Sequence, residues 1–270
     1  MSENTRNWII EHYKENQRSY DAPINRDFYS KIASLACKAG MTGGFVPKRI
    51  IDIGSGTGIS ASVVNQMFPE ASIFTLDPSK EKSVTGRNIE NVVSHYYCRL
   101  ADMNVSEEFD LLICSMSYHW FDVDDKRALK GVATNAGTLV ISTPTRRLSE
   151  SLQNCLETGN LILKEVYSEM MEPKDISLTP REWRGIDLLK EEIDGFKIKS
   201  RVEVEMRESI SGCDFGDVLH SRGLTLALFG PKALPAYEAL KRKASSIEKV
   251  EISWPIGLIV AKRDQPLLSS

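Results

Sequence analysis

Three alternate glycines follow a short apolar run near residue 50. Residues 49–53 read as a buried strand, and the loop 54–58, Gly-Ser-Gly-Thr-Gly, follows it directly. Because glycine has no Cβ, such a loop can turn sharply and bring its backbone amides close to a ligand. Apolar residues at helical spacing predict a helix over 58–68, which adds its own N-terminus to that site. The segment therefore predicts a strand, a loop and a helix that together bind a ligand through the backbone.

An acidic residue ends the next predicted strand. Asp77 follows Gly54 by twenty-three residues and is itself followed by Pro78. Dinucleotide-binding folds also place an acid after the second strand, but their loop has the spacing G-x-G-x-x-G and holds a pyrophosphate. The spacing here is G-x-G-x-G. It disfavours a nicotinamide-dependent oxidoreductase, which remains an alternative.

The first half of the chain alternates short apolar runs with helical patterns, which is typical of βαβ units and a mostly parallel sheet. A helix capped by Asn25 and closed at Gly40 precedes the first strand. We expect five strands in this half, over 49–53, 72–77, 93–98, 109–115 and 138–142.

The second half is interrupted by two longer stretches, 143–195 and 206–250, that read as helical insertions. Two further strands, 196–205 and 254–262, are expected to form an antiparallel hairpin at the sheet edge. The sequence thus predicts one α/β domain over 1–270, with a doubly wound, seven-stranded, mostly parallel sheet. An N-terminal helical arm over 1–45 precedes the core over 46–142.

Charge, cysteine spacing and targeting signals indicate which partners and which cellular location to expect. The chain has 34 basic and 37 acidic residues, a formal net charge of −3, so nucleic acid is not an expected partner. The five cysteines show no C-x-x-C spacing, and no metal-ligand pattern is present. Neither a signal peptide nor an apolar run long enough to span a membrane is found. We therefore expect a cytoplasmic protein without a metal or a membrane contact; the sequence leaves the oligomeric state open.

The G-x-G-x-G loop resembles motif I of the class I S-adenosylmethionine-dependent methyltransferases. A second segment, Ser-Tyr-His-Trp-Phe-Asp over 117–122, resembles the His-Trp-Phe segment of their type 11 group, which includes trans-aconitate methyltransferase. The similarity extends from about Tyr13 to Arg263 and is specific for the group rather than for a substrate. It implies S-adenosylmethionine as the cofactor, a Rossmann-like methyltransferase fold, and a small-molecule acceptor.

The resemblance also implies a role for individual residues. The glycine loop would lie against the amino-acid portion of the cofactor, and Asp77 would accept hydrogen bonds from both ribose hydroxyls. Asp102 would lie near the adenine amino group, with Met103 beside the ring. The cofactor-binding residues expected in this way are Gly54, Ser55, Gly56, Thr57, Gly58, Asp77, Pro78, Asp102, Met103 and Ser115.

Transfer of a methyl group from a sulfonium needs a well-positioned acceptor more than it needs catalytic side chains. His119 is the best candidate to take a proton from a hydroxyl or amine acceptor, and a packing role is its alternative. By family position, the acceptor pocket under a helical lid would include Tyr20, His119, Trp120, Trp183 and Arg222. We expect methyl transfer to O, N or C of a metabolite, with a non-catalytic cofactor-binding subunit as a further alternative.

Overall fold

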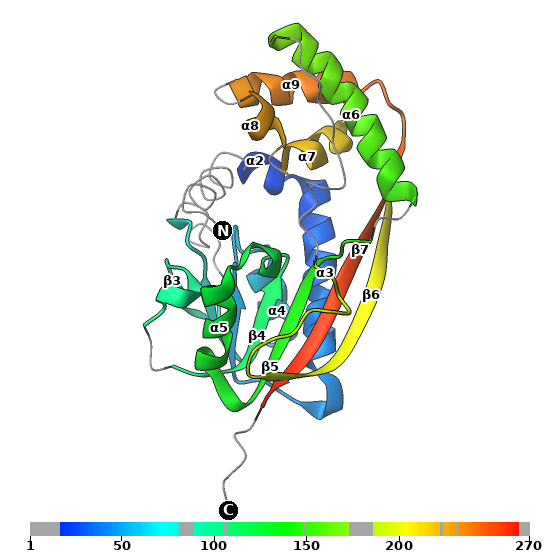
Figure 1. Ribbon diagram of the computed structural model, residues 1–270. Coiled ribbons are helices and arrows are strands. Elements are labelled where there is room, and N and C mark those ends of the chain that lie inside the picture. Colours follow the sequence, from blue (N-terminus) through cyan, green and yellow to red (C-terminus); the bar gives the residue numbers. More distant parts are fainter. Residues whose placement is uncertain are drawn as a thin grey trace, which may run out of the picture.

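The computed structural model describes residues 17–80, 89–104, 107–147, 150–172, 186–221, 224–229 and 232–264. Its centre is a seven-stranded sheet with the order β3-β2-β1-β4-β5-β7-β6 (Figure 1). The strands are β1 Arg49–Ile53, β2 Ser72–Leu76, β3 Val92–Tyr96, β4 Phe109–Ser115, β5 Ala133–Pro144, β6 Phe196–Ile210 and β7 Val250–Arg263. Strands β1 to β5 pair in parallel, whereas β7 pairs antiparallel with both β5 and β6. The expected fold class and the edge hairpin are confirmed.

Helices cover both faces of the sheet. On one face, α3 Pro23–Gly40 and α4 Ile59–Met67 bury Ala36 and Val64 against Ile50 and Ile113 of the sheet. On the other face, α5 Val123–Val132 packs through Leu129. Because β1 and β4 are buried on both faces, their residues are mostly apolar rather than alternating, with Asp52 of β1 as a buried exception.

The register of the sheet brings two chain segments to the same edge. Ile53 of β1 lies opposite Leu76 of β2, so Gly54 and Asp77 leave the sheet side by side. The amides of Gly54 and Ser55 both donate to the Leu76 carbonyl, at 2.7 and 3.1 Å. The strand order reverses between β1 and β4, and ligands of open α/β sheets bind outside the carboxyl ends of the strands at such a point.

A group of helices stands above this carboxyl edge (Figure 1). It contains α2 Gln17–Tyr20 and four helices that we call the upper helices: α6 Glu150–Met170, α7 Gly212–Ser221, α8 Leu224–Phe229 and α9 Ala233–Ala244. The upper helices share one apolar core with the start of α3 and with the hairpin, through residues such as Phe28, Val166, Phe215, Leu240 and Trp254. They are therefore packed firmly onto the sheet domain. None of the described helices is both long and apolar enough to cross a membrane.

The prediction that Asn25 caps a helix is wrong. Helix α3 begins at Pro23, because the fixed φ of proline suits the first helical position and its missing N–H is not needed there. Asn25 lies within the first turn and is buried. Its amide donates to the Ser19 carbonyl at 2.7 Å and to the Asp217 carbonyl at 3.5 Å. Asn25 thus joins the segment around α2 to α7.

The hairpin is longer than the sequence predicts. Residues 206–210 and 250, expected within a helical insertion, belong to β6 and β7, and β7 also includes residues 251–253, for which no element was predicted. The reason is tertiary packing: Ile210, Val250 and Ile252 are buried in the core of the upper helices. Strand β5 is likewise longer than the expected 138–142.

Candidate functional site

The glycine loop depends on a close approach between two strand ends. Gly54 has φ +75°, and a Cβ atom there would overlap the Cβ of Ser117 and lie 2.9 Å from its Oγ. Ser117 follows β4 and donates a 2.6 Å hydrogen bond to the Ile53 carbonyl. Only glycine meets both requirements, the left-handed backbone and the contact with Ser117.

The next two glycines turn the loop toward the carboxyl edge. Gly56 has φ +53°, and a Cβ atom there would meet no heavy atom of the described chain within 4 Å. Gly58, with φ +83°, is the residue that caps α4. Ser55 and Thr57, between them, are buried. The loop therefore presents bare backbone at the start of a helix, where a ligand can approach closely.

Asp77 is oriented by backbone amides on both oxygens. Its Oδ2 accepts a 2.9 Å hydrogen bond from the Gly56 amide, and its Oδ1 accepts one of 2.9 Å from the Ser79 amide. Its own amide donates to the Tyr96 carbonyl of β3 at 3.1 Å. These bonds hold the carboxylate in a fixed orientation at the end of β2, beside the glycine loop. Pro78 follows directly after Asp77, in the turn that these bonds fix.

Asp52 is a buried acid behind the glycine loop. The Ser60 hydroxyl of α4 donates to its Oδ2. Burial raises the pKa of Asp52 to about 7; the Ser60 hydrogen bond opposes this rise, and the charge of Asp77 adds to it. This hydrogen bond therefore connects β1 to the first turn of α4.

The segment after α2 contacts the loop directly. The Thr57 hydroxyl donates a 2.8 Å hydrogen bond to Asp21 Oδ1. Tyr20, which immediately precedes Asp21, stacks on Tyr29 of α3 with ring centroids 4.6 Å apart. Tyr20 is therefore the neighbour of a residue that touches the loop. The structure also adds Asp21 to the site.

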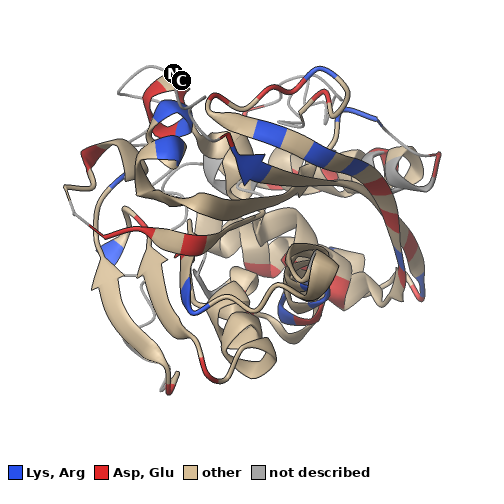
Figure 2. Cartoon of the chain, turned by 90° about the horizontal axis from the view of Figure 1, so that it is seen from below, with Lys and Arg blue, Asp and Glu red and all other residues tan. Residues whose placement is uncertain are grey.

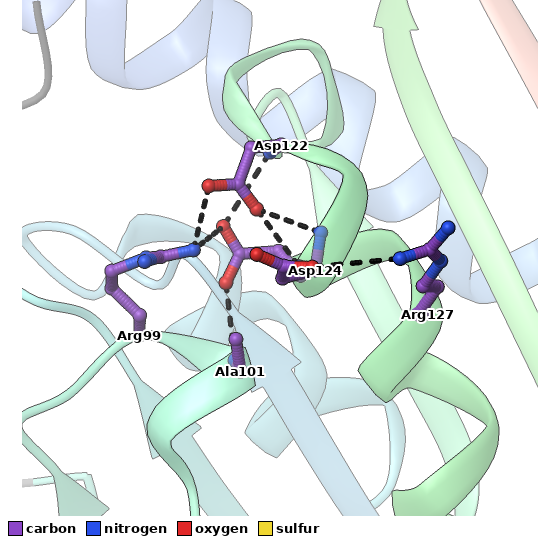
Figure 3. Close-up of polar contacts among 6 residues, drawn as sticks. Arg99, Ala101, Asp122, Asp124 and Arg127 are labelled. Carbon is purple, nitrogen blue, oxygen red and sulfur yellow. Dashed lines mark hydrogen bonds and ion pairs between the residues drawn. The ribbon is translucent and has the colours of Figure 1, made fainter. Parts of the chain in front are cut away.

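Asp102 and Met103 follow β3 at the same edge of the sheet. Asp102 is the last residue of η4 Leu100–Asp102, a 3-10 helix of one turn, and is exposed. Met103 packs against the apolar core on the α5 side. Arg99, just before the turn, pairs with Asp122 and Asp125 at the start of α5 (Figure 3). The turn is thereby tied to the segment that follows β4.

That segment begins with a strained residue. Met116 has φ +57°, which bulky side chains rarely adopt, and its side chain reaches the core of the upper helices. Ser115, the last residue of β4, accepts a 3.3 Å hydrogen bond from the Ser142 hydroxyl of β5. The chain then enters the 3-10 turn η5 Tyr118–Trp120. The strand ends of β4 and β5 are thus joined at the carboxyl edge.

His119 lies in η5 against β5. Its Nδ1 is 3.1 Å from the Thr143 hydroxyl, and Thr143 is fully buried. The ring of His119 is tilted on that of Trp120, with centroids 4.8 Å apart. Thr143 therefore orients the imidazole of His119 at the carboxyl edge of the sheet.

A family model described as a methyltransferase domain matches residues 20–225. The chain belongs to this methyltransferase family. The class I resemblance implies S-adenosylmethionine as its cofactor, and the nicotinamide alternative no longer applies.

A curated protein matches part of this methyltransferase at low identity. A curated relative, malonyl-[acyl-carrier protein] O-methyltransferase of Bacillus anthracis, is 26% identical over an alignment of 124 residues that covers 42% of this chain. The match spans only 45% of the relative's own length.

Two solved structures show the same fold. A protein of Anaeromyxobacter dehalogenans assigned as a type II methyltransferase has a TM-score of 0.55 at 16% identity, covering 85% of this chain and 95% of its own. A structure on the conversion of a disulfide bond into a thioacetal group during echinomycin biosynthesis has a TM-score of 0.52 at 18% identity, covering 88% and 83%.

The residues of the methyltransferase fit its cofactor. Bare loop backbone at 54–58 suits the amino-acid end of S-adenosylmethionine, and the oriented carboxylate of Asp77 suits its ribose. Two residues of the expected acceptor pocket, Trp183 and Arg222, lie outside the described residues.

Sequence reasoning missed two residues that shape this site, Asp21 and Thr143. Thr143 had a usable signal, because it follows the expected end of β5 and so belongs to the same carboxyl edge as His119. Asp21 has no local pattern, since its role comes from a tertiary contact. The segment 115–120 was expected at the site, but the strain at Met116 and the contact of Ser117 with Gly54 follow only from the structure.

Proposed function

We propose that this methyltransferase modifies O, N or C of a small-molecule metabolite that is enclosed between the carboxyl edge and the upper helices. The observation that carries the proposal is the hydrogen bond between Thr57 and Asp21, because it fastens the segment after α2 to the cofactor loop. Asn25 continues this connection from Ser19 to α7. A covered site of this kind excludes water and orients a small acceptor.

In the proposed complex, the chain binds and orients the cofactor through residues of four strand ends. Gly54, Ser55, Gly56, Thr57 and Gly58 hold the amino-acid end, Asp77 and Pro78 the ribose, Asp102 and Met103 the adenine, and Ser115 the methyl-bearing end. The bound cofactor supplies an activated methyl group on a sulfonium. These residues supply alignment for an in-line displacement, which accounts for much of the acceleration in reactions of this type.

His119 is proposed to serve the acceptor. With Nδ1 engaged by Thr143, the tautomer that carries the proton on Nδ1 leaves Nε2 as a base for an O–H or N–H acceptor. Tyr20, Trp120, Trp183 and Arg222 complete the proposed acceptor pocket.

The charge distribution supports a small acceptor rather than a nucleic acid. Figure 2 shows basic and acidic residues on the same elements; along β6, Lys197, Lys199 and Arg201 precede Glu203 and Glu205. Nucleic-acid binding relies on clustered positive charge that neutralises phosphates. The mixed pattern favours a metabolite as the acceptor.

A labelling experiment tests the proposed acceptor class. The enzyme and S-adenosylmethionine with a labelled methyl group are incubated with a cell extract, which is then divided by ultrafiltration into metabolites and macromolecules. We expect the label in the metabolite fraction with the wild type and far less of it with His119→Ala. Label that stays on protein, including a carrier protein such as the curated relative uses, or on nucleic acid would contradict the proposal.

A further inference from the structure

Arg99 forms a partly enclosed ion-pair cluster between two segments of the site (Figure 3). Its Nη2 lies 2.8 Å from Asp122 Oδ2 and 3.0 Å from Asp125 Oδ2. The side chains of Arg99, Asp122 and Asp125 are only 23%, 6% and 11% exposed. Ion pairs in such surroundings are screened less by solvent than ordinary surface pairs.

Both carboxylates also bind backbone, so the cluster connects two pieces of main chain. Asp125 Oδ1 accepts a 3.1 Å hydrogen bond from the Ala101 amide in η4. Asp122 Oδ1 accepts from the amides of Asp124 and Asp125, both at 3.0 Å, and so caps α5. The cluster therefore holds η4 against the first turn of α5, which begins shortly after His119 and Trp120.

Asp102 is linked to this cluster through the main chain. Its amide donates to the Arg99 carbonyl at 3.1 Å. Because Asp102 is exposed and lies in a single 3-10 turn, that turn needs outside contacts to keep a fixed position. Arg99, just before the turn, and the Ala101 amide, within it, provide such contacts.

We propose that Arg99 is a positioning residue for adenine recognition: with Asp122 and Asp125 it holds the turn so that the Asp102 carboxylate meets the adenine amino group. This inference rests on the proposed role of Asp102. It predicts that removal of Arg99 lowers the selectivity for the amino group, beyond any general effect on stability.

Selectivity is measured as a ratio of two dissociation constants by calorimetry. S-adenosylhomocysteine carries the amino group, and S-inosylhomocysteine carries an oxygen in its place. The wild type is expected to bind S-adenosylhomocysteine about tenfold or more tightly, because the inosyl analogue cannot donate the hydrogen bond to the charged Asp102 carboxylate. Asp102→Ala should reduce the ratio to near one, and Arg99→Met should reduce it severalfold toward that value.

Arg127→Met is the matched control. Arg127 belongs to α5, as Asp125 does, and pairs with Asp124 at 3.8 Å (Figure 3). The side chains of Arg127 and Asp124 are 67% and 68% exposed. Arg127→Met removes one positive charge from α5 but leaves the contacts of η4 with Arg99 and Asp125 unchanged. Its ratio should equal that of the wild type.

The outcomes separate the inference from the role on which it rests. A wild-type ratio in Arg99→Met, with Asp102→Ala near one, would overturn the inference and leave Asp102 in its role. A wild-type ratio in Asp102→Ala would overturn both the inference about Arg99 and the proposed role of Asp102. If Arg99→Met does not fold, the double variant Asp122→Asn with Asp125→Asn serves instead. Its amide oxygens can still accept from the backbone amides, while both ion pairs of Arg99 are lost. An unchanged ratio there also overturns the inference.

Discussion

Replacing Gly54 by alanine tests the contact on which the glycine loop depends. Two costs are expected. A left-handed backbone at φ +75° costs a residue with a Cβ about 1–2 kcal/mol. Overlap of that Cβ with Ser117 adds about 1–3 kcal/mol, the usual penalty for overpacking. The free energy of unfolding should therefore fall by about 2–5 kcal/mol.

Gly44→Ala separates the two costs. Gly44 has the same φ of +75°, but a Cβ atom there would meet no described heavy atom within 4 Å. Only the backbone strain applies, so this variant should lose about 1–2 kcal/mol. A third variant combines Gly54→Ala with Ser117→Gly, which removes the obstructing side chain. Measured against Ser117→Gly alone, the Gly54 substitution should then cost no more than the strain.

Urea unfolding followed by circular dichroism gives the three differences, provided that the slopes with denaturant agree. Equal losses in Gly54→Ala and Gly44→Ala would refute the reasoning, because they would show that the chain accommodates the overlap freely. An undiminished cost of Gly54→Ala in the Ser117→Gly background would refute it as well.

Three further predictions concern acids and bases of the site. Asp77→Ala should weaken binding of S-adenosylhomocysteine by about 1.5–3 kcal/mol, the range for hydrogen bonds to a charged group, and calorimetry showing wild-type affinity would count against the assignment. His119→Ala should lower kcat by on the order of 10²–10⁴ while the cofactor dissociation constant changes little; wild-type turnover in a steady-state assay would leave His119 a packing role. Asp52 has its pKa raised to about 7 in the folded state, so its contribution to stability is fully present below about pH 4 and is lost as the pH rises through about 7. Between those limits the wild type should lose on the order of 4 kcal/mol relative to Asp52→Asn, and identical pH profiles in urea unfolding would contradict the raised pKa.

The sequence predicted best what local physics determines. Strands β1 and β4 have the predicted bounds, because each is a short apolar run buried on both faces and followed by a turn. The G-x-G-x-G spacing and Asp77 located the loop and the acid that the structure joins by the Gly56 amide. These features depend on nearby residues and on the parallel sheet alone.

Long-range packing determined the rest. The hairpin extends to Ile210 and from Val250 because the upper helices bury its ends. Asn25 failed as a cap because its amide is used between Ser19 and α7, which no local pattern reveals. The need for glycine at position 54 was clear from its motif, but its reason, the contact with Ser117, required the strand order.

A crystal structure of the complex with S-adenosylhomocysteine tests the central claim most directly. We predict both ribose hydroxyls within hydrogen-bond distance of the Asp77 carboxylate, with the amino-acid end of the ligand along residues 54–58. A nucleoside bound away from the carboxyl ends of β1 and β2, or a ribose that does not meet Asp77, would contradict the account.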